Sequence, residues 1–404
     1  MSIFYLIFIL LTIHFSYRYD SIEEYDSHKQ HRLWLMCAYM ICLTGFSYGL
    51  GGDKFTYMEE FEYYPESFSD ASEYILSGVI LRGQMPSWTI VNILCRNVFG
   101  SFYAVQLMES AAINIAVCYI VSKYTKRYFL FLLIYFFSLK YFIFNCEVMR
   151  EGFAIAMVLF GMHSYMTGRK WLFYLLLLFA LTFHVSAACV LLFPFIRFKL
   201  SWKTLYIAIA MSFVCWLASD MIMGRVLGLA FGGEGAFAQK VMFYSLQASS
   251  FFGYLRYLLT YLIFPYIIMY FMILNEQSED MKRRRIKLTS FMVVLAIIAI
   301  SIYPLARFYN YVQIFYLIMF TDFLFTLLRS YEHLVIRIGT CIGTFLLMFW
   351  FYFSHYETTN SYYYDFFYPY TCILNEDKSV FFRSIAHDEA VNPQATEKNT
   401  RDIQ

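Results

Sequence analysis

The chain has 404 residues, of which 60% are hydrophobic and only 15% are charged, and its formal net charge is +2. Soluble domains carry about 25% charged residues, so this composition excludes an ordinary soluble domain and predicts a polytopic, all-α integral membrane protein. The nine cysteines form neither a Cys-x-x-Cys motif nor a cluster with histidines, which argues against a zinc site and against a disulfide framework.

Apolar runs long enough to cross a bilayer recur along the chain. In chain order they lie near residues 2–16, 33–50, 102–122, 128–145, 148–166, 202–222, 251–274, 287–304, 308–328 and 334–354. The first run lacks a basic n-region and a small-residue cleavage site, so we interpret it as a retained span. The run 171–196 is interrupted by Phe-His-Val-Ser at 183–186. We expect a broken hairpin of two short helices there, which brings the total to roughly twelve crossings.

The placement of lysine and arginine predicts the orientation, because short cytoplasmic loops are enriched in both. The basic segments are 17–32, 122–127, 167–170, 197–203, 275–287 and 329–337. All six fall on the cytoplasmic side only if the run 171–196 goes out and returns. The opposite side then holds a large loop, 51–100, whose second half is expected to form interfacial or re-entrant helices. We predict one transmembrane helical domain over residues 1–375 and a disordered polar tail over 376–404.

Several polar residues are predicted to share the outer membrane face. Arginines occur at the outer ends of three spans: Arg150, Arg256 and Arg307. Because guanidinium groups bind phosphate oxygens through pairs of N–H donors, arginines gathered on one face indicate an anion held at the lipid interface. His184 lies at the tip of the broken hairpin, and Asp53 begins the large outer loop.

Each of these residues also has a plainer interpretation. An arginine at a helix end can be an anchor whose charged group reaches the headgroups. Glu147 and Arg150 have the i,i+3 spacing of a helix-surface ion pair. His184 can be a hydrogen-bonded structural residue, and Asp53, which follows two glycines, can be a turn residue.

The same residues belong to short motifs. The most specific block runs from Met-Arg-Glu-Gly-Phe-Ala at 149–154 to Phe-His-Val-Ser-Ala at 183–187. Weaker motifs contain Gly51, Asp53, Tyr57 and Phe61, then Arg307 with Tyr311, and finally Pro369 with Tyr370. With these motifs the sequence resembles the EpsG-type family of bacterial polysaccharide polymerases, which are related in role to the Wzy O-antigen polymerases. Glu151 stands where that family usually has glutamine.

The resemblance implies a membrane glycosyltransferase that joins oligosaccharide repeat units carried on polyprenyl (undecaprenyl) pyrophosphate, for O-antigen, capsule or exopolysaccharide synthesis. It implies a multi-pass protein of the bacterial cytoplasmic (inner) membrane whose active site faces the periplasm or exterior. The implied partners are the lipid-linked oligosaccharides, the lipid bilayer, and a chain-length regulator and a flippase of the same pathway, with no nucleic acid.

The resemblance and the chemistry together assign roles. The departing pyrophosphate is expected to be stabilised by Arg150 with Arg256 or Arg307. The incoming sugar hydroxyl needs a general base, which is Asp53 or His184. The remaining substrate-binding residues are expected to be Tyr57, Tyr311 and Glu147.

Other membrane functions remain open at this point. An O-antigen ligase would use the same donor, a lipid-linked sugar flippase or transporter would also place arginines around a polar cavity, and a membrane acyltransferase could use a histidine base. The sequence has no Asp-x-Asp nucleotide-sugar motif and no cluster of metal ligands. We therefore expect neither a nucleotide-sugar donor nor a metal or other cofactor.

Overall fold

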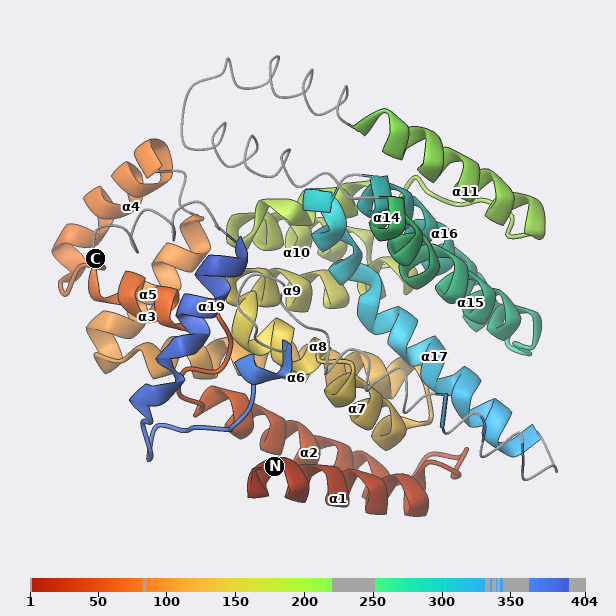
Figure 1. Ribbon diagram of the computed structural model, residues 1–404, viewed down its shortest axis with the longest axis horizontal. Helices are drawn as coiled ribbons and strands as arrows, with labels where there is room; N and C mark the ends of the chain where they lie inside the picture. The colour runs from red at the N-terminus through yellow and green to blue at the C-terminus, as the bar shows by residue number, and fades with distance from the viewer. Residues whose placement is uncertain are drawn as a thin grey trace. The chain divides into compact units, whose positions relative to one another are not determined.

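The computed structural model describes residues 2–82, 85–219, 251–301, 303–330 and 363–391, with single residues between 335 and 343. These described residues form helices and no β-strand (Figure 1). The all-α fold class is thereby confirmed. Almost all of the predicted span 334–354 lies outside the described residues.

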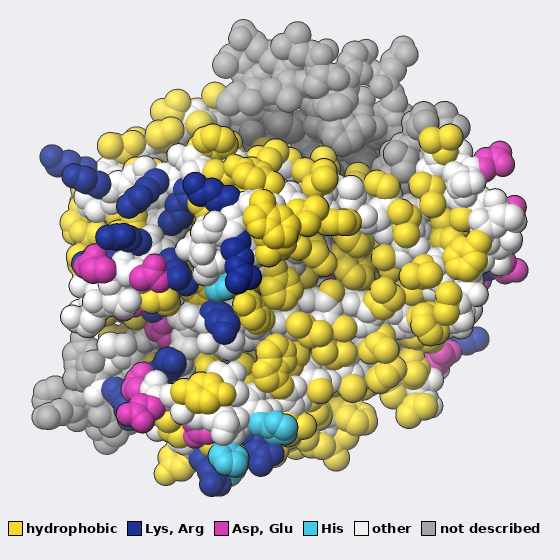
Figure 2. All heavy atoms as spheres, turned by 180° about the vertical axis from the view of Figure 1, so that it is seen from behind, with side chains coloured by type: hydrophobic (Ala, Val, Ile, Leu, Met, Phe, Trp, Pro, Cys, Tyr) yellow, Lys and Arg dark blue, Asp and Glu magenta, His cyan; other side chains and the backbone are white. Residues whose placement is uncertain are grey.

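The described helices include candidate membrane spans. Three are long and apolar enough to cross a bilayer: Phe102–Tyr124, Phe251–Leu274 and Leu305–Arg329. A bent pair, Tyr128–Phe137 with Lys140–Glu147, adds a broken candidate, and the shorter apolar helices are Ile3–Tyr19, Lys170–Phe183 and Trp202–Leu217. Many large hydrophobic side chains are exposed, and Figure 2 shows how many of the visible side chains are hydrophobic. The described residues thus support a helical membrane protein, whereas roughly twelve crossings stays a prediction.

The chain forms two compact units, each described by itself. Unit 1 comprises Met1–His163, Tyr174–Val185 and Leu324–Gln404, and unit 2 comprises Ser164–Phe173 and Ser186–Phe323. The prediction of one transmembrane domain over residues 1–375 stays a prediction.

Unit 1 contains most of the N-terminal helices. They are α1 (Ile3–Tyr19), α2 (Ser27–Gly45), α3 (Lys54–Glu62), α4 (Phe68–Arg82), α5 (Pro86–Phe99), α6 (Phe102–Tyr124), α7 (Tyr128–Phe137), α8 (Lys140–Phe142), the π-helix η1 (Ile143–Glu147) and most of α9 (Met149–Met166) and α10 (Lys170–Phe183). Side-chain caps mark where two of these helices begin. At the start of α2 the Asp26 carboxylate accepts hydrogen bonds from His28 N at 2.7 Å and Lys29 N at 3.1 Å, and Ser101 caps α6. The predicted loop 51–100 therefore contains three helices, α3 to α5.

Unit 2 is built around α16. Its elements are the 3₁₀ helix η2 (Val185–Leu192), α11 (Trp202–Leu217), α14 (Phe251–Tyr257), the π-helix η3 (Leu258–Ile263), α15 (Phe264–Leu274), α16 (Glu279–Ser301), the 3₁₀ helix η4 (Tyr303–Tyr309) and most of α17 (Asn310–Ser330). Hydrogen bonds join the ends of three helices, because Ser301 Oγ donates to Ser212 O at 3.2 Å and Ser212 Oγ lies 3.1 Å from Tyr254 OH. A buried ion pair, Arg285 with Asp322 at 2.9 Å, fixes α17 against α16.

The predicted span 128–145 is broken rather than continuous. The chain bends by 80° between α7 and the α8–η1 segment. At the bend Leu139 has φ +60°, a left-handed conformation that is unfavourable for a residue with a Cβ. No glycine or proline marks this break in the sequence. The break matters because η1 leads directly to the start of α9.

The interruption of the run 171–196 is present. Helix α10 ends at Phe183, and η2 begins at Val185 on the far side of His184. Since the end of α10 and η2 fall in different units, the return of the chain across the membrane stays a prediction.

The predicted disorder from Glu376 is wrong for residues 376–391. After η5 (Tyr363–Phe366) the chain forms η6 (Lys378–Phe381) and α19 (Phe382–Val391), which lies beside α3 (Figure 1). The Arg383 side chain is fully buried. It donates to the carbonyl oxygens of Gly49 at 2.8 Å, Asp365 at 3.0 Å and Pro369 at 2.6 Å. These bonds supply order that a polar composition does not reveal. Residues 392–404 lie outside the described residues.

Candidate functional site

The predicted Gly-Gly-Asp motif forms a tight loop between α2 and α3. Gly51 has φ +92°, and a Cβ there would lie 3.0 Å from Cys146 O, so glycine is required for both conformation and space. Its N–H donates to Phe366 O at 2.8 Å. The loop that leads to Asp53 is therefore held between the η1 segment and the C-terminal segment.

Glu147 holds the other side of this loop. Its carboxylate accepts hydrogen bonds from Gly52 N at 2.9 Å and from Asp53 N at 3.3 Å. The following residue, Val148, has non-helical angles that separate η1 from α9, so Glu147 and Arg150 do not lie on one continuous helix. The ion pairs within the described part of the chain do not include this pair. The structure makes Glu147 a residue that positions the Asp53 loop.

Arg150 lies over the ring of Tyr57. The guanidinium carbon is 5.2 Å from the ring centroid, a distance at which a cation is attracted to an aromatic face. Burial raises the pKa of Tyr57, so the phenol stays protonated, and its hydroxyl donates to Glu147 O at 3.5 Å. Arg150 is absent from the ion pairs within the described part of the chain. Apart from its side-chain hydrogen bond to Tyr57, its N–H donors can serve an anionic ligand.

A series of aromatic rings extends from this arginine to the end of α10. Ring centroids are 5.4 Å apart for Tyr57 and Trp88, 6.4 Å for Trp88 and Phe153, and 4.8 Å for Phe153 and Phe183. His184, which is half-buried, follows Phe183 directly. Trp88 is only 2% exposed, and its Nε1 has no hydrogen-bond partner among the described residues. The sequence interpretation missed Trp88, since a tryptophan in an apolar helix resembles any membrane aromatic.

Two ionisable side chains, Lys54 and Glu109, are fully buried in unit 1. Burial lowers the pKa of Lys54, and the nearby carboxylates oppose that effect. A Cβ at Gly152 would overlap the Glu109 carboxylate. The sequence signal for Glu109 was available, because a carboxylate inside an apolar span usually has a specific role.

The remaining predicted residues belong to unit 2. Arg256 and Arg307 are both exposed. Tyr311 is fully buried, and its hydroxyl lies 2.7 Å from Ser186 Oγ. In unit 1, Asp53, Tyr57, Glu147 and Arg150 are brought together around one loop. A pyrophosphate clamp that combines Arg150 with Arg256 or Arg307 stays a prediction.

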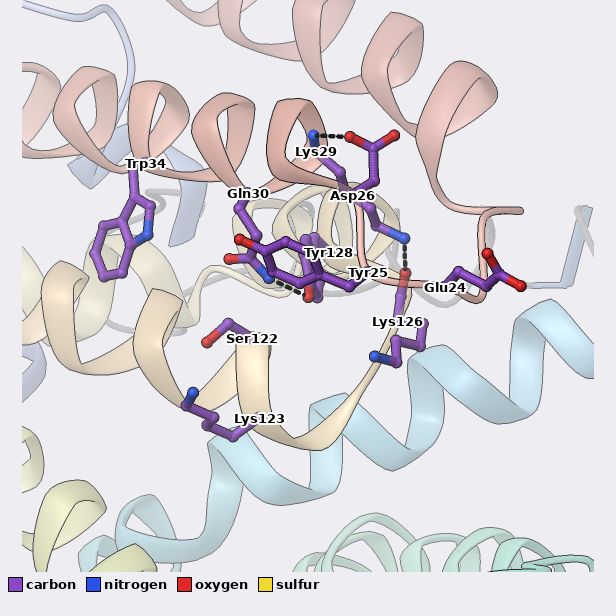
Figure 3. A pocket seen from close by; sticks show the side chains of 10 residues that line it. All are labelled: Glu24, Tyr25, Asp26, Lys29, Gln30, Trp34, Ser122, Lys123, Lys126 and Tyr128. Carbon is purple, nitrogen blue, oxygen red and sulfur yellow. Dashed lines mark hydrogen bonds between the residues drawn. The ribbon is translucent and has the colours of Figure 1, made fainter.

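A basic pocket of about 380 Å³ lies where α2 begins and α6 ends (Figure 3). Gln30 Nε2 donates to Tyr128 OH at 2.6 Å inside it, and Lys123 and Lys126 contribute from the end of α6. The buried Lys29 ammonium donates to the carbonyls of Ile22 at 3.0 Å and Lys126 at 2.6 Å. This pocket belongs to the basic segments 17–32 and 122–127, so we do not assign it to the reaction.

Asp20 caps helix α7. Its carboxylate accepts from Phe129 N at 3.2 Å and from Leu130 N at 2.7 Å. Burial raises the pKa of Asp20 to about 6, despite these bonds. The cap therefore carries a carboxyl group that titrates close to neutral pH.

Among the described residues, no three His, Cys, Asp or Glu side chains lie close enough together to hold a metal ion. Anion binding by Arg150 and proton transfer by Asp53 or His184 stay predictions.

The chain was compared with protein families, curated proteins and solved structures. The model of the EpsG family matches residues 32–372, which include every residue named above as a site candidate. No curated protein and no solved structure matches the chain.

Proposed function

The chain belongs to the EpsG family, and from this membership we propose that it polymerises oligosaccharide repeat units carried on a polyprenyl pyrophosphate. The proposed setting is the outer face of a bacterial cytoplasmic membrane, in the synthesis of O-antigen, capsule or exopolysaccharide. The basic segments support this orientation, because they leave Arg150 and the Asp53 loop on the opposite side.

The proposed reaction is a glycosyl transfer. A hydroxyl oxygen of the incoming repeat unit forms a bond to the anomeric carbon of the growing chain. The bond from that carbon to the pyrophosphate oxygen breaks, and the pyrophosphate leaves with its lipid. The hydroxyl proton goes to Asp53 or His184, and the added negative charge on the leaving group is stabilised by arginine. The products are a chain longer by one repeat unit and a free polyprenyl pyrophosphate.

One observation carries the proposal: Arg150 lies over the Tyr57 ring, next to a loop whose N–H groups are held by Glu147. The neutral ring gives the guanidinium a fixed position without neutralising it. A pyrophosphate can therefore accept charge-assisted hydrogen bonds from Arg150 N–H groups that a carboxylate partner would otherwise engage. Asp53 stands at the N-cap position of α3, and its side chain does not cap that helix.

The first test is a deletion strain. If the protein is a polymerase, the surface polysaccharide should shrink to single repeat units on a normal core. Complete absence of repeat units from the core would contradict the proposal and favour an O-antigen ligase or a flippase.

The second test replaces the guanidinium fork. Arg150→Lys keeps the positive charge but loses paired N–H donors, so we expect loss of most chain extension. The matched control is Arg18→Lys, because Arg18 also lies over a tyrosine, 5.6 Å from the Tyr19 ring, but on the surface of α1. Full chain extension by Arg150→Lys at normal protein levels would assign Arg150 to anchoring only.

A further inference from the structure

A hollow of about 470 Å³ lies along α3. We call it the Tyr48 groove. Its walls include Tyr48, Glu59, Glu62, Phe102, Tyr103 and Glu376. Because successive helical residues are 100° apart, α3 presents Tyr57 and Phe61 to the protein interior and Glu59 and Glu62 to the groove. Glu59 is six residues beyond Asp53, about 9 Å along the helix axis, so the groove begins close to the predicted reaction centre.

Tyr48 contributes a polar group to the wall of the groove. Its side chain is only 8% exposed, and it lines the groove. Neighbouring groups are already paired, since Tyr103 OH donates to Glu376 Oε1 at 2.8 Å and Arg96 binds Glu62 at 2.9 Å. The Tyr48 hydroxyl has no hydrogen bond to any of the described residues. This hydroxyl is not one of the fully buried polar atoms that lack a partner. It is therefore open to the groove, where it can exchange bound water for a hydrogen bond to a ligand.

The chemistry of the walls selects the kind of ligand. Aromatic rings offer apolar faces with a polar edge, and carboxylates accept strong hydrogen bonds from hydroxyl groups. Glu59 is exposed, and its carboxylate has no ion pair within the described part of the chain. Three carboxylates repel phosphate and pyrophosphate. They also do not gather as a metal site among the described residues. A molecule with many hydroxyl groups, apolar C–H faces and no negative charge fits these walls.

We propose that the Tyr48 groove binds the uncharged saccharide part of a repeat unit and holds it beside the Asp53 loop. This inference rests on the proposed polymerase function and adds a specificity to it. Sugars that carry a carboxylate should be excluded from the groove, because their charge would meet Glu59, Glu62 and Glu376.

The test measures binding separately from catalysis. The full-length protein is placed in nanodiscs and titrated with the repeat-unit oligosaccharide that mild acid releases from the host strain's lipid carrier. A second probe is the same oligosaccharide after its primary hydroxyls are oxidised to carboxylates. Binding constants come from calorimetry, and size-exclusion chromatography checks the fold of each variant.

Two substitutions remove single groups from the groove. Tyr48→Phe deletes a hydroxyl that the described fold does not use, and it should weaken binding of the first probe by about 2- to 13-fold, the effect of one neutral hydrogen bond. Glu59→Gln should weaken binding of the first probe by roughly tenfold. It should also reduce the preference of the protein for the first probe over the oxidised probe. The matched controls are Tyr63→Phe and Glu73→Gln, exposed residues of the same outer region that do not line the groove. Both should bind like wild type.

Chain extension is assayed with the same preparations. A wild-type protein that extends chains while both groove variants bind the probe as well as the controls would overturn the groove proposal alone. Equal or tighter binding of the oxidised probe, or no binding of the first probe, would also overturn it. A wild-type protein that binds the probe but never extends chains would contradict the proposed function instead.

Discussion

Glu147→Gln is the substitution that tests how the Asp53 loop is held. The carboxylate accepts hydrogen bonds from two backbone N–H groups, at 2.9 and 3.3 Å. Glutamine keeps one oxygen and turns an NH₂ group towards the other N–H. One charge-assisted bond becomes neutral, which costs about 1–1.5 kcal/mol, and one backbone donor loses its partner, which costs about 1–3 kcal/mol. The loop should therefore lose about 2–4.5 kcal/mol of stabilisation.

At about 1.4 kcal/mol per tenfold change, that loss lowers the ratio of docked to released loop by roughly 30- to 1,600-fold. We expect slower chain extension from purified lipid-linked repeat units and a lower melting temperature of the purified protein. The control is Glu73→Gln, which neutralises an exposed carboxylate on α4 and should change neither quantity. If Glu147→Gln melts and extends chains like wild type, Glu147 does not position the loop.

Three further predictions follow from other contacts. Loss of the general base should reduce chain extension by about 10²–10⁴-fold, and we expect Asp53→Asn to show this loss. If Asp53→Asn extends chains within tenfold of wild type while His184→Gln is inactive, the general base is His184 instead. Gly51→Ala should destabilise the purified protein more than Gly168→Ala, because both glycines have φ near +90° but only Gly51 would place a Cβ 3.0 Å from Cys146 O; equal melting temperatures would rule out that contact. Burial raises the pKa of Asp20 to about 6, above its value in the unfolded chain, so the free energy of unfolding should rise by up to about 3 kcal/mol as the pH falls from 6 towards 4. Thermal melts of Asp20→Asn should lack that rise, and an unchanged pH profile in the variant would exclude Asp20 as its source.

The sequence motifs identified the residues around the Asp53 loop but did not predict the contacts between them. Tyr57 and Arg150 were both candidates, but the cation–aromatic contact joins residues from different helices, and no local pattern encodes it. Glu147 was assigned to substrate binding, and its interaction with Asp53 N spans 94 residues of chain. Hydropathy located most helices because apolar runs are local. It missed the bend at Leu139, where tertiary packing overrides local preference.

The C-terminal segment shows the same limit. Its composition is polar, which predicted disorder, yet Arg383 is fully buried against three carbonyl oxygens. Backbone carbonyls are present at every residue and leave no trace in the sequence. A buried arginine that is paired only with backbone is therefore invisible until the fold is known.

The contact from Arg383 to Gly49 has a consequence for the order of biosynthesis. It closes a separation of 334 residues, so the part of the loop next to Gly51 lacks this contact while the ribosome is still making the C-terminal region. Contacts between distant residues form late because the intervening chain must first be ordered. The newly inserted helices would thus wait in the membrane with an unfinished Asp53 loop. The described arrangement of this loop can therefore form only after Arg383 has been synthesised.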